Sequence, residues 1–182
     1  MFTIKEMIDN ISNIDEMQLV KISDRLWKMG NLEEIKEKVS PNLFNLHIGI
    51  NMIGNWKGEG WWGIICEHAD LVSYIPETLD KFNLTELKIA FENVIKLFPE
   101  DTVFKSDNAS YYDICNFLQS ANLKVENERL NDIPKDKRRE IVKQVRQNVD
   151  RLENLTKPIW GDSVEDKGWK TVLDYSLNNL EE

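Results

Sequence analysis

The sequence predicts an all-α fold, a single compact domain (1–182) of six to nine helices with little or no sheet. Apolar residues recur at spacings of three and four in five segments, which is the pattern of one buried helix face. Prolines and capping residues separate these segments, and no stretch sustains the alternation of apolar and polar residues typical of a half-buried strand. At most a short extended piece is expected, near residues 102–105 or 123–126.

N-terminal helices are predicted for residues 1–39, and the main helical core is predicted for residues 40–180. In the first part, an apolar stripe predicts a helix that ends near Met29, where Gly30 is a typical helix end. A second, short helix is predicted over residues 32–38.

The main core is expected to open with a buried helix. Ser40 suits the N-cap position and Pro41 the first helical position, and the residues that follow through Ile53 are apolar on most sides. Farther along the chain, Asn83 and Glu86 have the spacing of a capping box, which predicts the start of another helix.

Prolines and polar caps also delimit the later helices. Pro99 is expected to stop the helix before it, because the proline ring disfavours helical geometry in the preceding residue. Ser106 or Asp107 is expected to cap the next helix, and the last helix is expected to start near Glu165.

A basic helix is predicted over residues 135–151. Apolar residues recur there at i, i+4, i+8 and i+11, while basic residues such as Arg138 are expected to point away from this stripe. A charged face beside an apolar stripe is typical of a solvated helix packed on a core, and the alternative is a surface that binds nucleic acid or an acidic partner.

Twelve large apolar residues are predicted to be mostly buried in the core. They are Trp61, Trp62, Ile64, Ile65, Leu87, Phe91, Val94, Ile95, Phe98, Ile141, Val145 and Trp169. If the Trp62 side chain is fully packed, its truncation to alanine is expected to cost on the order of 3–5 kcal/mol.

The net charge of −9 restricts the partners that the chain can bind. Residues 131–157 form a basic island with eight Lys or Arg and five Asp or Glu, and acidic residues predominate elsewhere. Phosphate backbones repel an acidic protein, so direct nucleic-acid binding is not expected. A protein partner is expected instead: a basic protein, a DNA-binding protein or a toxin.

A cytoplasmic location is expected, without membrane association. No apolar run approaches the roughly 18–20 residues of a membrane span. Met1–Glu6 places an acidic residue where a signal peptide would carry basic and then apolar residues. The two cysteines, Cys66 and Cys115, provide no disulfide framework.

The most unusual stretch of the sequence is rich in glycine and tryptophan, from Gly54 to Gly63. Glycine suits tight turns, and a glycine-rich turn before a helix can bind phosphate on free N–H groups. The Gly-Lys-Ser/Thr ending of a phosphate loop is absent. The stretch is therefore interpreted as a corner between two buried helices, with a partner-binding surface as the alternative.

Four residue types that can bind metals occur within Cys66–Asp70, but the stretch does not have the spacing of a known metal site. A cysteine nucleophile would need a base, and the sequence offers only His47 and His68. His68 diverges from Cys66 on a helix because it is two residues away. No catalytic residue, metal site or cofactor is therefore assigned.

A group of acids with few basic neighbours is the predicted binding surface. These candidate binding residues are Glu59, Glu67, Asp70, Asp162, Glu165 and Asp166, together with Trp56. If their carboxylates form one negative surface, they could occupy the site of a protein that binds phosphates.

Several motifs resemble a bacterial family of unknown function that includes a Neisseria DNA-mimic protein. The similar segments, spread over roughly residues 40–180, are Gly58-Glu59-Gly60-Trp61-Trp62, Leu79-Asp80, Ile95-Lys96-Leu97-Phe98-Pro99, Leu152-Glu153-Asn154-Leu155, Leu173-Asp174-Tyr175 and Asn178-Asn179. Gly60-Trp61 stands where the family has Gly-Phe, and the asparagine before the glycines is not matched. The resemblance implies a helical fold and makes DNA mimicry conceivable.

The leading hypothesis for function is a non-enzymatic protein-binding module that acts through an acidic face, as a DNA-mimic-like regulator would. One alternative is an immunity protein that neutralises a toxin. The other is a hydrolase that uses carboxylates near the turn at Gly58–Gly63.

Overall fold

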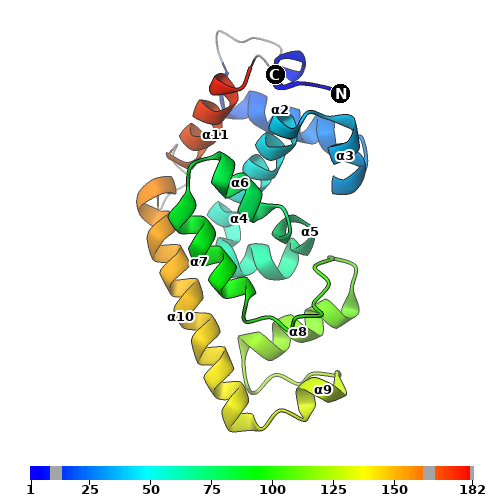
Figure 1. Cartoon of the computed structure of the whole chain (residues 1–182), viewed down its shortest axis with the longest axis vertical. Helices are drawn as coiled ribbons and strands as arrows, with labels where there is room; N and C mark the ends of the chain where they lie inside the picture. Colours follow the sequence, from blue (N-terminus) through cyan, green and yellow to red (C-terminus); the bar gives the residue numbers. More distant parts are fainter. Residues whose placement is uncertain (9–13, 162–166, 181–182) are drawn as a thin grey trace.

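The computed structural model describes residues 1–8, 14–161 and 167–180, and it confirms the all-α fold class. The described residues form an elongated helical structure with both chain ends at the same pole (Figure 1). Its helices are α1 (Ile4–Met7), α2 (Glu16–Trp27), α3 (Leu32–Lys38), α4 (Pro41–Glu67), α5 (Ala69–Val72), α6 (Ile75–Lys81), α7 (Thr85–Ile95), α8 (Ala109–Gln119), α9 (Glu128–Asn131), α10 (Lys135–Trp160) and α11 (Lys167–Asn178).

The eleven helices of the described residues exceed the predicted six to nine because α1, α5 and α9 have only four residues each. Such single turns are too short for a periodic apolar pattern to reveal them. Neither 102–105 nor 123–126 forms a strand. Within the described residues, an isolated parallel β-bridge joins Phe2 to Val39. This bridge attaches the N-terminal segment to the start of the core.

Helix α4 lies at the centre of the molecule and begins as predicted. The Ser40 hydroxyl accepts a hydrogen bond from Leu43 N at 3.2 Å, and Pro41 occupies the first turn. The helix packs against α2, α3, α5, α6, α10 and α11. Contact on all these sides explains why the residues through Ile53 are apolar nearly all round.

The predicted capping box of Asn83 and Glu86 does not form. Helix α7 begins at Thr85 with Leu84 as its N-cap, and Asn83 ends α6 instead. Asn83 has a φ of 59° and donates its N–H to Asp80 O, while Leu84 N donates to Leu79 O. This pair of bonds is a Schellman motif, a helix end for which asparagine can adopt the left-handed conformation.

Two other predicted helix starts are corrected or lie outside the described residues. Helix α8 is capped by Asn108, whose side chain accepts from Ser110 N at 3.0 Å, and not by Ser106 or Asp107. Helix α11 is described from Lys167 onward, and Glu165 lies outside the described residues.

Helix α10 is longer than predicted and holds a buried cation. It runs along one side of the molecule against α7 and α8 (Figure 1). Arg138, expected to point away from the apolar stripe, is buried, and its guanidinium donates to the carbonyl oxygens of Asn116, Phe117, Ser120 and Leu123 at 2.7–3.1 Å. Arg138 therefore binds carbonyl oxygens in the last turn of α8 and in the segment after it, where helical N–H partners run out.

One continuous hydrophobic core contains residues from both ends of the chain. Nine of the twelve predicted core residues are buried, and Trp61, Ile64, Ile65, Phe91 and Val94 are fully so. The other three, Trp62, Ile95 and Ile141, are half-buried at its edge. Among the described helices, none has both the length and the apolar character needed to cross a bilayer.

Candidate functional site

The glycine- and tryptophan-rich stretch is a kinked part of α4. The kink is at Gly60, whose φ of 69° breaks the helical geometry and favours glycine. At the break, Glu153 Oε1 from α10 accepts the hydrogen of Trp61 N at 2.6 Å. The other oxygen of Glu153 accepts from Trp56 Nε1 at 2.8 Å. The predicted corner is thus confirmed, and a carboxylate holds it.

Tryptophan side chains fill the space around this kink. Trp61 is fully buried, and its ring lies 5.6 Å from Trp160 and 5.4 Å from Phe91. Its Nε1 donates to Thr156 Oγ1 at 2.7 Å. Trp56, a predicted binding residue, lies in the same core and is 7% exposed, so its ring packs inside the molecule and not on the surface.

The predicted acidic residues are partly placed by the structure. Glu59, Glu67 and Asp70 are all exposed. Glu59 Oε2 lies 3.7 Å from His68 Nε2, so this acid has a neighbour that can carry positive charge. The other three predicted acids, Asp162, Glu165 and Asp166, lie outside the described residues, and a single surface formed by all six stays a prediction.

The cysteines face the interior. Both Cys66 and Cys115 are buried free cysteines, and a hydrogen bond joins their thiols. The hydrogen bond with Cys115, together with burial, raises the pKa of the Cys66 thiol. A raised pKa disfavours the thiolate that a nucleophile or metal ligand needs. Within the described part of the chain, no three His, Cys, Asp or Glu side chains are grouped as metal ligands would be.

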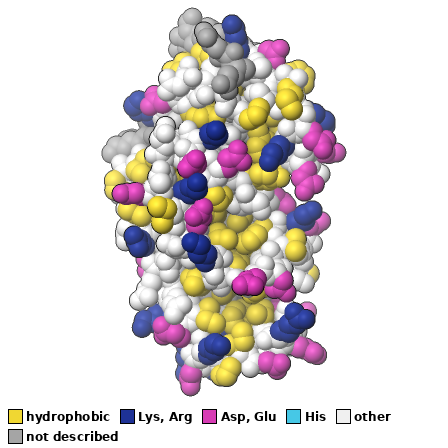
Figure 2. All heavy atoms as spheres, viewed as in Figure 1, with side chains coloured by type: hydrophobic (Ala, Val, Ile, Leu, Met, Phe, Trp, Pro, Cys, Tyr) yellow, Lys and Arg dark blue, Asp and Glu magenta, His cyan; other side chains and the backbone are white. Residues whose placement is uncertain are grey.

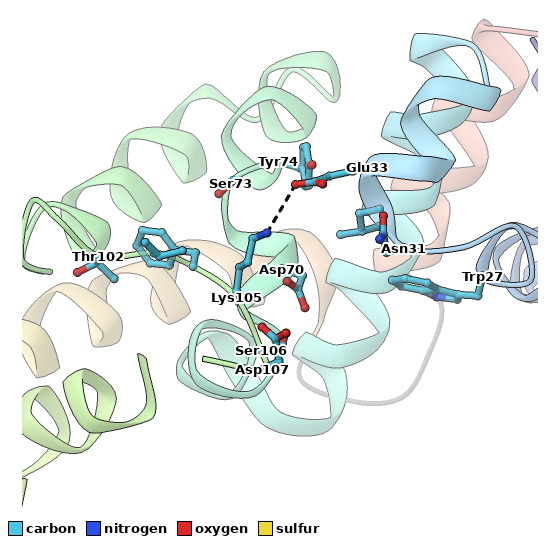
Figure 3. A pocket seen from close by; sticks show the side chains of 13 residues that line it. Trp27, Asn31, Glu33, Asp70, Ser73, Tyr74, Thr102, Lys105, Ser106 and Asp107 are labelled. Carbon is cyan, nitrogen blue, oxygen red and sulfur yellow. Dashed lines mark ion pairs between the residues drawn. The ribbon is translucent and has the colours of Figure 1, made fainter. Parts of the chain in front are cut away.

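A groove of about 800 Å³ opens where three separate segments meet. Its walls come from the end of α2 and start of α3, from the turn between α5 and α6, and from the segment 102–107 before α8. Figure 3 shows Asp70 in the middle of this groove, with Tyr74 and Glu33 on one side and Lys105 reaching across from the opposite wall.

Carboxylates predominate among the charged side chains that the structure places around this groove. Glu33, Asp70 and Asp107 line it together with one cation, Lys105. Lys105 Nζ lies 3.9 Å from Glu33 Oε1, and both side chains are more than half exposed. Burial raises the pKa of the Tyr74 phenol, and the charges of Glu33 and Asp70 raise it further. Two acids from different helices therefore act on the same point of the groove.

Trp27 forms a firm wall of the groove. It is 42% exposed, yet its Nε1 donates to Asn51 Oδ1 at 3.1 Å, and its ring centroid lies 4.8 Å from that of His47 in a T-shaped arrangement. His47 is fully buried, and burial lowers its pKa to about 4. The exposed indole is thus held in place from below.

A serine and histidine pair lies beneath this wall. Ser23 Oγ is 3.2 Å from His47 Nδ1, and Asn51 Nδ2 donates to Ser23 Oγ at 3.0 Å. Both Ser23 and His47 are buried under Trp27, so a substrate in the groove does not reach the hydroxyl. The pair is a polar link between α2 and α4.

Sequence reasoning found Asp70 but missed the residues that surround it. Glu33, Tyr74 and Lys105 belong to segments up to 72 positions apart and match no motif. The one local signal was Trp27, which continues the apolar stripe of α2 at an exposed position. Comparison of the chain with protein-family models, with curated proteins and with solved structures gives no match in any of the three.

Proposed function

We propose that this chain is a non-enzymatic protein-binding module that holds a basic segment of a partner protein in the groove at Asp70. The observation that carries the proposal is the position of Asp70. It makes no ion pair with any described residue, and it lies in a groove with Glu33, Asp107 and the exposed ring of Trp27.

The charges of the groove favour an incoming cation. Exposed ion pairs such as Lys105 with Glu33 contribute only about 0–1 kcal/mol, so an arginine or lysine of the partner can displace Lys105 at small cost. Asp70 provides a second carboxylate for the same group. Guanidinium and ammonium groups also interact favourably with the face of a tryptophan ring. Because the Trp27 ring is already held by Asn51 and His47, little conformational entropy is lost when a partner binds to it.

The size of the groove favours an extended segment over a folded domain. Its volume of about 800 Å³ is within the roughly 300–1,000 Å³ of sites that enclose small ligands. A few peptide residues fill such a volume. Basic tails and loops of DNA-binding proteins are extended segments rich in Lys and Arg, and basic toxins can carry such segments too. The proposal is therefore compatible with both predicted partner classes.

The turn at Gly60 offers less support for the hydrolase alternative. One carboxylate at this turn belongs to Glu153, and both of its oxygens accept hydrogen bonds from the protein itself. The other, Glu59, is exposed, and its Oε2 lies 3.7 Å from His68 Nε2. This arrangement favours a structural role for Glu153.

Charge reversal at Asp70 tests the proposal, with Glu67 as the matched control. Both acids are exposed and only three residues apart, but Glu67 does not line the groove. Wild-type, Asp70→Lys and Glu67→Lys chains are immobilised, and the proteins they capture from lysate of the source cells are quantified at about 0.1 M and 1 M salt. The Debye length falls from about 10 Å to about 3 Å over this range.

Wild type and Glu67→Lys are expected to capture partners that bind in the groove. Asp70→Lys is expected not to capture them, and high salt is expected to release them from all chains. Equal capture by all three chains, or capture that salt does not weaken, would contradict the proposal. Circular dichroism of each variant controls for folding.

A further inference from the structure

A second hollow lies beside the groove, and its exposed lining is mostly apolar, although Glu92 and Lys96 also border it. It measures about 230 Å³ and is formed by the turn between α5 and α6, the C-terminal part of α7 and the segment before α8. The apolar lining residues are Val72, Pro76, Phe91, Ile95 and Phe104. Figure 2 shows hydrophobic side chains gathered along the middle of this face, with charged side chains on both sides.

The hollow and the groove share a wall. Ser73 and Phe104 line both of them, so the two spaces are adjacent. Ile95 is half-buried, although the sequence predicts it to be a core residue, because it borders this hollow. A peptide segment that crosses Ser73 and Phe104 would contact both spaces.

We infer that the partner segment carries a large apolar side chain next to its basic residue, and that this side chain anchors in the hollow while the basic residue binds at Asp70. The inference rests on the proposed function and adds to it the chemical class of the segment.

The dimensions of the hollow fit one side chain. An apolar cavity of ~150 Å³ in another protein accepts benzene, so about 230 Å³ accommodates a leucine or phenylalanine. Such an anchor is expected to tighten binding roughly 10- to 100-fold, because burial of a side chain of this size has a free energy equivalent to that factor. The charge of the neighbouring groove then selects segments in which the anchor is flanked by Lys or Arg.

Synthetic peptides test the two subsites separately. Three fluorescein-labelled peptides of equal length are compared by anisotropy on the full chain: one with two arginines and a leucine, one with serine in place of the leucine, and one with glutamates in place of the arginines. Each is made with the leucine one, two or three residues from the nearest arginine.

Ile95→Gln polarises the hollow, and Ile89→Gln is its matched control. Both residues are on α7, and Ile89 is 51% exposed and does not line the hollow. On wild type and Ile89→Gln, the arginine–leucine peptide is expected to bind roughly 10- to 100-fold tighter than the serine peptide in at least one spacing. On Ile95→Gln, this ratio is expected to fall close to one.

The outcomes separate the inference from the function on which it rests. If the serine peptide binds wild type as tightly as the leucine peptide, the inference is wrong and the basic-segment function stands. If the glutamate–leucine peptide binds best, or no peptide binds, both are wrong. If Ile95→Gln converts a dimer of the chain to a monomer in sedimentation, the hollow is an interface between copies, and this also overturns the inference. If Ile95→Gln does not fold, the wild-type ratio alone decides.

Discussion

The kink at Gly60 and the groove at Asp70 lie ten residues apart in the chain, but they are built in opposite ways. At the kink, Trp61 is fully buried and Glu153 uses both carboxylate oxygens within the protein. In the groove, Asp70 is exposed and makes no ion pair with a described residue, and the ion pair of Lys105 and Glu33 is long and solvated.

The difference shows that the residues that stand out in the sequence are not the ones left free to bind a partner. Glycines and tryptophans stand out in the sequence because a dense core needs large rings and one special backbone conformation. The groove needs groups that are left partly without protein partners, and ordinary surface residues provide these. A carboxylate already bonded on both oxygens has little left to offer a partner, whereas a solvated one has its full charge.

The largest expected effect is at the kink. Trp61→Ala removes a fully buried ring and its hydrogen bond to Thr156, and should lower the free energy of unfolding by on the order of 3–5 kcal/mol. Trp62, for which the sequence predicted this cost if fully packed, is half-buried, so Trp62→Ala should cost less, roughly 1–2 kcal/mol. Urea denaturation of both variants measures the difference between the two stability losses. Equal midpoints would contradict the prediction that Trp61 contributes more than Trp62.

The next effect concerns the wall of the groove and depends on pH. Burial lowers the pKa of His47 to about 4, from about 6.5 in an unfolded chain. Between these values the unfolded chain binds a proton that the folded chain does not, so stability falls as pH decreases from about 6.5 to 4. The loss attributable to His47 is about 3 kcal/mol over the whole window.

A His47→Gln variant isolates this loss from the titration of the carboxylates. It should unfold more easily at neutral pH, and its free energy of unfolding should decline less between pH 7 and 4.5 than that of wild type. Parallel pH profiles for the two proteins would show that His47 is not held neutral by the core.

A smaller effect is expected at the carboxylate that holds the kink. Glu153→Gln keeps the shape of the side chain but replaces one acceptor oxygen with a donor, which then faces Trp61 N or Trp56 Nε1. Hydrogen bonds to charged groups contribute about 1.5–3 kcal/mol, so a cost of about 1–2 kcal/mol is expected with the remaining bond intact. Glu140→Gln on the exposed face of the same helix should change stability by less than about 0.5 kcal/mol.

The smallest effect on stability is expected in the groove, where the readout is electrostatic. Asp70→Asn should leave the unfolding free energy within about 0.5 kcal/mol of wild type. It should lower the pKa of Tyr74, because the negative charge of Asp70 disfavours the phenolate. Alkaline titration followed by phenolate absorbance measures this shift, and Tyr74→Phe identifies the transition. An unmoved transition would mean that Asp70 does not act on Tyr74.

Local rules predicted those parts of the fold that depend on neighbours in the sequence. Ser40 and Pro41 start α4 as expected, because a cap needs only the next few N–H groups. Asn83 satisfied two local rules at once, as a helix start and as a helix end, and the turn between α6 and α7 selected the second. Arg138 was expected on the surface because its role depends on carbonyls at the end of α8 and just after it, 15–22 residues away.

By itself, the sequence determined the helical class, the starts of α4 and α10 and most of the core, since these follow from apolar periodicity and short-range capping. Tertiary structure alone decided that Glu153 meets Trp61, and that Glu33, Asp70 and Lys105 surround one groove. The reason is physical. A hydrogen bond or a shared electrostatic field depends on distances across the fold, and the packing of α4 against its neighbours sets those distances.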